Sequence, residues 1–153
     1  MDISLAIKDE LRKFCESFAE ERIYRINNSI KGLNDSLNSE TKSSAGDKHE
    51  TGRAMIQLER EKLGHQLYEA EKMRHVLAGI NSPDNSSKVG QGSLVITTDS
   101  AYYISISAGV FKRESSQIYC VSAVSPIGKI LLGKSLGHCF EFNQKTICVE
   151  KIL

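Results

Sequence analysis

Two stretches of the chain carry an apolar residue at every third or fourth position. They cover residues 5–37 and 56–77, with charged and polar residues between the apolar positions. Residues three and four positions apart share one face of a helix, so the spacing predicts two helices with one apolar stripe each. The expected helices extend from Ser4 to Asn38 and from Asp47 to Ile80, each roughly 50 Å long. The stripe positions are Leu5 or Ile7, Leu11, Phe14, Phe18, Ile23, Ile26, Ile30, Leu33 and Leu37, then Ile56, Leu63, Leu67, Ala70, Met73, Val76 and Leu77.

The segment between the two expected helices, residues 39–46, is short and polar. Helices of equal length joined by such a segment suit an antiparallel hairpin, in which the two apolar stripes cover each other without a third partner. We therefore expect residues 1–80 to form a long antiparallel two-helix coiled coil, with its tip near residues 39–50.

The remainder of the chain has the pattern of a β domain. Turn-forming residues at positions 79–87 separate it from the helices. Short apolar or alternating runs then cover residues 93–97, 101–106, 118–121, 139–142 and 146–152, which predicts a small, mostly antiparallel sheet. The expected fold class is α+β, with a hairpin at 1–80, a linker at 81–91 and a C-terminal domain at 92–153.

One short helix is expected inside the β domain, over residues 125–134. Pro126 near its start and Gly133 near its end are typical helix boundaries. On the pattern alone, Ile127, Ile130 and Leu131 would cover one face of the sheet, whereas Lys129 and Lys134 would be solvated charges.

The composition supports this division and narrows the function. Residues 1–80 contain no proline and hold 27 of the 39 Asp, Glu, Lys and Arg side chains. The formal net charge of +1 argues against a protein that coats nucleic acid, because such proteins carry a basic excess. We find no apolar stretch of about 18 residues and no signal peptide, so we expect a cytoplasmic protein without a membrane partner.

The four cysteines are expected to be small buried apolar residues. Cys15, Cys120, Cys139 and Cys148 lie in apolar surroundings and show no C-x-x-C spacing. The pattern therefore favours buried thiols over disulfides or metal ligands, and it gives no zinc site.

The expected tip carries candidate chemistry. Residues 34–50 have a net charge of −2, from four acids and two lysines. Asp47 and Glu50, three residues apart at a helix start, can converge on a hard cation such as Mg²⁺ or orient a water. The same spacing is typical of a helix N-cap with a capping box, and the two interpretations are compatible. His49 beside them is expected to be a solvated surface residue.

Several motifs together resemble the Gre family of bacterial transcript-cleavage factors (GreA and GreB). Residues 124–137, with Ser-Pro-Ile-Gly-Lys and Leu-Leu-Gly-Lys, resemble the family's C-terminal signature, and Lys-Val-Gly-Gln-Gly at 88–92 resembles the start of the same domain. The domain in that family has a fold similar to the FK506-binding-protein type. A hairpin whose tip carries Gly-Asp-x-x-Glu at 46–50 completes the order, so the resemblance covers nearly the whole chain.

The resemblance implies an accessory factor rather than an enzyme. Gre factors dock at the rim of the RNA polymerase secondary channel through the C-terminal domain and insert the hairpin, so that the polymerase cleaves backtracked RNA at its 3′ end. By match, Asp47 would be the principal ligand of an Mg²⁺ shared with the polymerase, and Glu50 its partner; the chain would have no cofactor of its own. The docking residues expected from the match are Pro126, Ile127, Gly128, Lys129, Gly133 and Lys134.

Two other interpretations stay open. The chain could be a Gre-like channel regulator that inhibits polymerase without stimulating cleavage, since residues 51–54 and the serine-rich approach to the tip depart from the family pattern. It could also be a coiled-coil interaction module unrelated to polymerase. An exposed hairpin leaves self-association open, although no residue identifies an interface for it.

Overall fold

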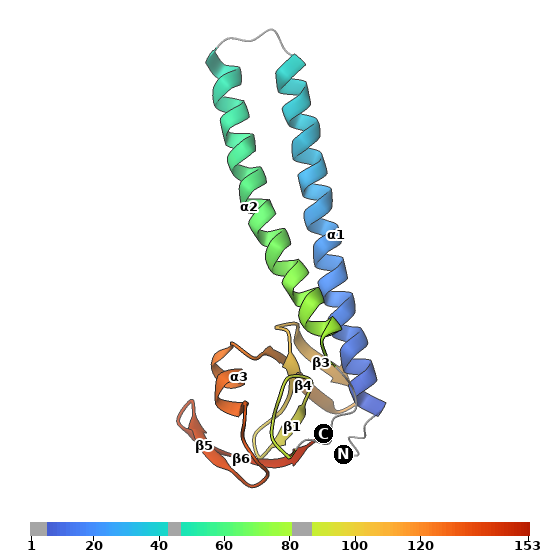
Figure 1. Cartoon of the computed structure of the whole chain (residues 1–153), viewed down its shortest axis with the longest axis vertical. Helices are drawn as coiled ribbons and strands as arrows, with labels where there is room; N and C mark the ends of the chain where they lie inside the picture. Colours follow the sequence, from blue (N-terminus) through green and yellow to red (C-terminus); the bar gives the residue numbers. More distant parts are fainter. Residues whose placement is uncertain (1–5, 43–46, 81–86) are drawn as a thin grey trace. The chain divides into compact units, whose positions relative to one another are not determined.

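The computed structural model describes residues 6–42, 47–80 and 87–153, and the side chains of 6–39, 51–80 and 87–153 (Figure 1). The chain forms two compact units, one of residues 19–74 and one of residues 1–18 with 75–153. The α+β fold class is confirmed. Its elements are α1 (Ala6–Lys42), α2 (Asp47–Ala78), β1 (Leu94–Thr97), β2 (Ala101–Ser105), β3 (Gly109–Arg113), β4 (Ser116–Ser122), α3 (Pro126–Leu131), β5 (Cys139–Phe142) and β6 (Lys145–Ile152).

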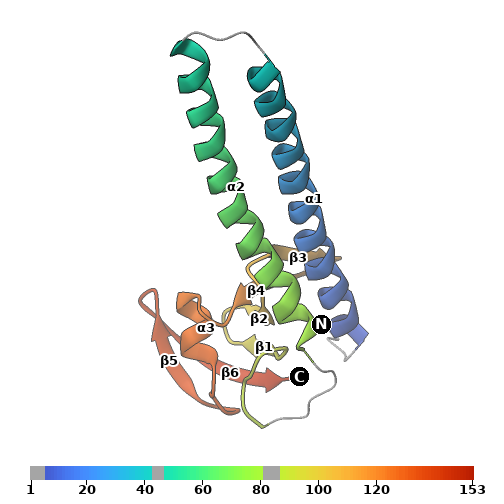
Figure 2. The same cartoon turned by 45° about the horizontal axis from the view of Figure 1, so that its top comes forward.

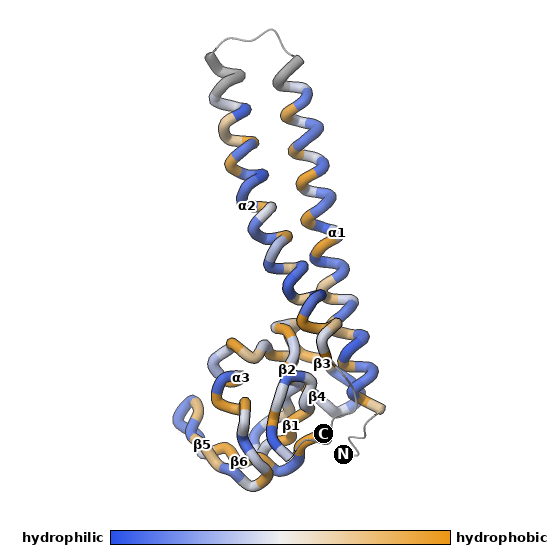
Figure 3. Tube along the Cα trace, viewed as in Figure 1, coloured by the Kyte–Doolittle hydropathy of each residue, from blue (hydrophilic) through white to orange (hydrophobic). Residues whose placement is uncertain are grey.

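Residues 19–74 form a two-helix hairpin held by the predicted apolar stripes (Figure 3). Ile23, Ile26 and Ala70 are buried in a common cluster, and Ile30, Leu63 and Leu67 pack against it. Nearer the described ends of the two helices the stripe residues are only half-buried. A hollow of about 460 Å³ lies there, lined by Asn34, Leu37, Gln57, Arg60 and Glu61.

An ion pair also joins the two helices of this unit. Arg74 donates from Nε and Nη2 to the two carboxylate oxygens of Glu20, at 2.6 and 2.8 Å. The hydrogen bond from Arg74 lowers the pKa of the Glu20 carboxyl. Because both side chains are about half exposed, the pair orients the helices more than it stabilises them.

The beginning of α1 and the end of α2 belong to the same compact unit as the sheet. Arg12 on α1 donates hydrogen bonds to the carbonyl oxygens of Leu77 (3.0 Å) and Ile80 (2.6 Å). The last carbonyls of a helix lack intrahelical partners, and a cation there is favoured by the helix dipole. Arg12 therefore caps the C-terminal end of α2.

The sheet has six strands in the order β3-β4-β2-β1-β6-β5, and it is mixed rather than purely antiparallel (Figure 2). β2 and β4 pair in parallel over five residues, and every other neighbouring pair is antiparallel. The connection between β2 and β4 contains β3, a strand that the sequence pattern did not predict. β3 is an edge strand whose Val110 and Phe111 are only half-buried, so it lacks the apolar run of a core strand.

The core under α3 brings together residues from most of the C-terminal part. Ile127 and Leu131 of α3 are buried with Val95, Ile104 and other residues of the sheet, and Phe140 and Phe142 of β5 pack against this cluster. Figures 1 and 2 both place α3 beside β5 and β6. The prediction that Ile127 and Leu131 cover the sheet is confirmed, whereas Ile130 is half-buried.

The prediction for the cysteines is correct for one pair and wrong for the other. Cys15 and Cys120 are buried free thiols, and Cys15 Sγ lies 3.5 Å from Ser105 Oγ. Cys139 and Cys148 form a disulfide instead. They are register partners across β5 and β6, and this cross-strand pairing cannot be seen in the apolar pattern of either strand alone.

No helix within the described ranges has both the length and the apolar character needed to cross a bilayer.

Candidate functional site

The two predicted tip carboxylates occupy the first turn of α2, which begins at Asp47. The side chains of Asp47 and Glu50, like the whole tip segment from 43 to 46, lie outside the described residues. The capping and the Mg²⁺-binding interpretations therefore both stay predictions. Among the residues whose side chains are described, no group of three or more His, Cys, Asp and Glu could hold a metal ion.

The second predicted site is the Ser-Pro-Ile-Gly-Lys segment, which begins α3. Ser125 is the N-cap: its Oγ accepts a hydrogen bond from the Gly128 N–H at 3.1 Å and donates one to the Ser122 carbonyl at 2.7 Å. Pro126 follows in the first helical turn, where its missing N–H costs nothing and its fixed φ suits the helix. The motif therefore starts the helix as its sequence predicts.

Gly128 allows α3 to lie close to the end of β4. A Cβ at this position would stand 2.0 Å from the Ser122 carbonyl oxygen and 2.9 Å from Ser125 Oγ. Neither atom can withdraw easily, because one belongs to the backbone and the other holds the N-cap. The glycine is thus required for packing, and it is buried away from any partner.

The Leu-Leu-Gly-Lys segment ends α3 and joins it to the segment before β1. Gly133 has a φ of +81°, and its N–H donates to the carbonyl of Val89 at 2.8 Å. The Val89 N–H donates in return to the carbonyl of Lys134 at 2.9 Å. The next residues continue this pairing as a β-bridge between Lys88 and Ser135. The two motifs that carry the family resemblance in this domain are therefore hydrogen-bonded to each other.

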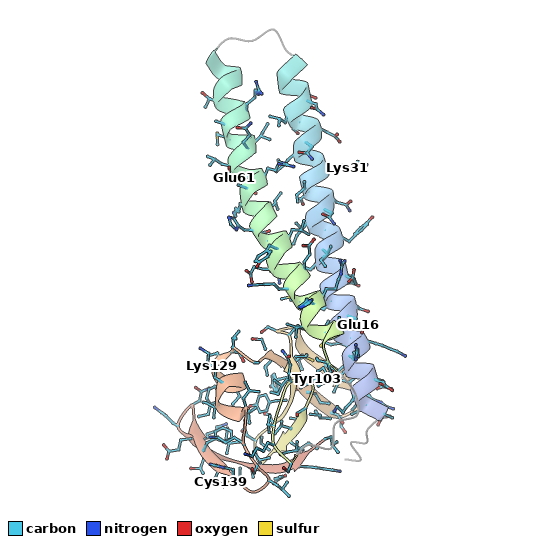
Figure 4. All side chains as sticks on the ribbon, in the orientation of Figure 1. Glu16, Lys31, Glu61, Tyr103, Lys129 and Cys139 are labelled. Carbon is cyan, nitrogen blue, oxygen red and sulfur yellow. A yellow bond between two sulfur atoms is a disulfide. The ribbon has the colours of Figure 1, made fainter. Side chains whose placement is uncertain are left out.

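The six predicted docking residues divide between the core and the surface. Ile127 and Gly128 are buried and Lys134 is half-buried, whereas Pro126, Lys129 and Gly133 are exposed. Lys129, labelled on α3 in Figure 4, is the exposed charged residue of the motif. A partner of this surface would thus meet Pro126, Lys129 and the turn at Gly133, while Ile127 and Gly128 support them from below.

Exposed apolar side chains flank the motif, and the sequence analysis did not single them out. Val124 is 76% exposed, Leu136 64% and Leu132 38%. A single large apolar side chain exposed to solvent is common in proteins. Several of them within one short segment are typical of contact surfaces. In the sequence these three residues are apolar positions that do not belong to the apolar face of the expected helix.

The charged side chains of this segment have one sign. Residues 115–140 contain Lys129 and Lys134 but no Arg, Asp or Glu. A local excess of lysine in a chain whose net charge is only +1 favours a partner with an acidic surface. The α3 surface, meaning Val124, Pro126, Lys129, Leu132, Gly133, Lys134 and Leu136, combines apolar contacts with positive charge.

No protein-family model matches the chain, and no curated protein sequence matches it. Among solved structures, the chain is similar to the transcription factor Gfh1, at 18% sequence identity and a TM-score of 0.34, over 88% of this chain and 90% of that chain. A likeness at this identity and TM-score assigns no residue and no activity. The functional interpretation depends instead on the motif residues and on the α3 surface that they build.

Proposed function

We propose that this chain is a Gre-like transcription factor that docks on bacterial RNA polymerase through the α3 surface and inserts its hairpin into the secondary channel. The observation that carries the proposal is the α3 surface itself. Part of the family-like motif does not serve the core, because Pro126, Lys129 and Gly133 are exposed. They lie next to exposed apolar residues.

The hairpin supports the same proposal. The two described helices have 37 and 32 residues and pack on each other within residues 19–74, and the expected tip lies in the sequence between them. Asp47 and Glu50 lie in the first turn of α2. Carboxylates at a helix start can cap the helix and can also offer a free oxygen to a cation that a partner holds.

The tip carboxylates would act together with groups of the polymerase. Two carboxylates are too few for an independent Mg²⁺ site, but they suit a cation that the partner also holds. Such an ion would stabilise the attacking and leaving oxygens in a phosphoryl displacement. In this proposal Asp47 contributes a ligand oxygen, Glu50 orients a water, and the chain alone has no nuclease activity.

RNA cleavage in a stalled, backtracked complex of the cognate polymerase tests the proposal. We expect the wild type to shorten the RNA in the presence of Mg²⁺, and Asp47→Asn and Glu50→Gln to bind without doing so. Asn caps helices nearly as well as Asp, so Asp47→Asn separates chemistry from helix capping when a thermal melt is run beside it. Lys129→Glu should weaken binding by charge reversal at an exposed position, with Lys112→Glu on β3 as the matched control.

The outcomes distinguish the alternatives. Binding by the wild type without cleavage would replace the cleavage factor with a channel regulator that inhibits polymerase. Absence of binding to polymerase would overturn both the cleavage factor and the channel regulator, and it would favour a coiled-coil interaction module. Normal RNA cleavage by polymerase in the presence of the Asp47→Asn variant would leave helix capping as the role of the tip carboxylates.

A further inference from the structure

The chain contains two pairs of cysteines with opposite properties. Cys15 and Cys120 are 0% and 3% exposed and stay as free thiols. The hydrogen bond with Cys15, together with burial, raises the pKa of the Cys120 thiol, which keeps it protonated. Cys139, labelled in Figure 4, is bonded to Cys148. Cys139 is exposed, and Cys148 is half-buried. The bonded pair is therefore the pair that a dissolved thiol can reach.

The backbone of Cys148 is fixed by hydrogen bonds to Thr98 that do not involve the sulfur atoms. Cys148 donates its N–H to Thr98 Oγ1 at 3.1 Å and accepts a hydrogen bond from the Thr98 N–H at 3.0 Å. Its backbone groups thus point away from β5, which makes Cys139 and Cys148 a non-hydrogen-bonded pair, with Cα atoms 4.0 Å apart. Side chains approach most closely in such pairs. The two thiols therefore face each other whenever β5 pairs with β6, so the bond can form again when the strand returns to the sheet.

The strand that the disulfide fixes has few other attachments. β5 lies at the edge of the sheet and pairs only with β6, over four residues. The turn between them places Asn143 and Gln144 at positive φ, 50° and 65°, a conformation that is unfavourable for a residue such as glutamine. The disulfide joins the two strands at the other end of the β5 ladder, and hydrogen bonds of Val149 with Gly137 and His138 continue the pairing beyond it. Loss of the disulfide would leave β5 held by this short ladder and by the packing of Phe140 and Phe142.

We propose that Cys139–Cys148 is a reversible thiol–disulfide exchange site, at which a dithiol reductant releases β5 from the sheet. A thiolate of the reductant attacks Sγ of Cys139, the exposed residue of the pair, forms a mixed disulfide and displaces the thiolate of Cys148, which takes up a proton. The second thiol of the reductant then displaces Cys139. The protein gains two electrons and two protons, and the reductant becomes a disulfide.

Release of β5 changes the support of α3. Phe140 and Phe142 leave the cluster that contains Ile127 and Leu131, so the helix loses part of its packing. The redox state of the Cys139–Cys148 bond thus determines how well ordered the α3 surface is. This inference stands independently of the function proposed above, because it concerns the sheet domain whatever its partner is.

The test treats the full chain with dithiothreitol without denaturant and follows both thiol alkylation and amide hydrogen exchange by mass spectrometry. We expect Cys139 and Cys148 to be alkylated together while Cys15 and Cys120 stay unmodified. Exchange in residues 137–147 should become about tenfold faster or more, since a disulfide that closes a short loop contributes at least that factor to an opening equilibrium. Exchange in β1 and β2 should not change, and oxidised glutathione should restore the slow exchange.

A variant with Cys139→Ser and Cys148→Ser is the matched control. It should show the fast exchange without any reductant and should not respond to dithiothreitol. The proposal is overturned if the bond is reduced only together with exposure of Cys15 and Cys120. It is equally overturned if reduction, or the double substitution, leaves the exchange of β5 unchanged.

Discussion

Substitution of Gly128 by alanine tests how α3 is built. The added Cβ would lie 2.0 Å from the Ser122 carbonyl oxygen and 2.9 Å from Ser125 Oγ, so α3 must move away from β4. Overpacking of a core typically costs about 1–3 kcal/mol, and a displaced N-cap costs about 1 kcal/mol. Alanine favours a helix over glycine by about 1 kcal/mol, which offsets part of that cost. We therefore expect Gly128→Ala to lower the free energy of unfolding by about 1–3 kcal/mol.

Gly90→Ala is the matched control, because a Cβ at Gly90 would meet nothing within 4 Å. It should change the free energy of unfolding by less than about 0.5 kcal/mol. Urea denaturation followed by near-ultraviolet circular dichroism measures both, since Tyr102, Tyr103 and Tyr119 lie in β2 and β4. A difference between the two variants below about 0.5 kcal/mol would refute the steric role assigned to Gly128.

Three further substitutions test the packing of the two units. Burial raises the pKa of Tyr103 to about 12. As the pH rises from about 10 through about 12, the wild type should therefore lose up to about 2–3 kcal/mol of unfolding free energy relative to Tyr103→Phe. An equal difference in urea midpoint between the two proteins at about pH 9 and at about pH 12 would contradict this. Arg12→Gln removes the cap of α2, so it should speed hydrogen exchange at the end of that helix and lower the free energy of unfolding by about 1–3 kcal/mol. Lys13→Gln, at an exposed position, should change neither quantity. Ile26→Ala in the hairpin seam should cost about 2–4 kcal/mol by thermal or urea melts, and a cost no larger than that of the exposed control Arg22→Ala would refute the seam.

Local patterns in the sequence predicted the helices well. The spacing of Ile23, Ile26 and Ala70 identified the seam, because helical periodicity relates residues that are near in sequence. The boundary signals at Ser125 and Pro126 likewise placed α3, since an N-cap acts within one turn.

Features that depend on distant segments could not be predicted in this way. The parallel pairing of β2 with β4 requires a connecting segment that reverses the chain direction. β3, at the sheet edge beyond β4, is that segment, and it has too little apolar character to be recognised. The Cys139–Cys148 bond depends on a cross-strand register. The hydrogen bonds between Val89 and the end of α3 join segments more than 40 positions apart.

The candidate site combines local and distant features in the same way. The motif around α3 was found from its residues, but its division into buried Ile127 and Gly128 and exposed Pro126 and Lys129 required the packing of α3 on the sheet. The exposed Val124 and Leu136 appear as surface residues only once the core has been identified.

The proposed function requires the hairpin tip to reach the RNA 3′ end inside polymerase. The most direct measurement places a photoreactive amino acid at position 43, within the predicted tip, and irradiates a backtracked complex that carries RNA labelled at its 3′ end. We expect the factor to crosslink to the labelled RNA, and Lys129→Glu in the same chain to reduce the crosslink by weakening docking. A factor that binds the complex but labels no RNA from the tip would contradict the claim.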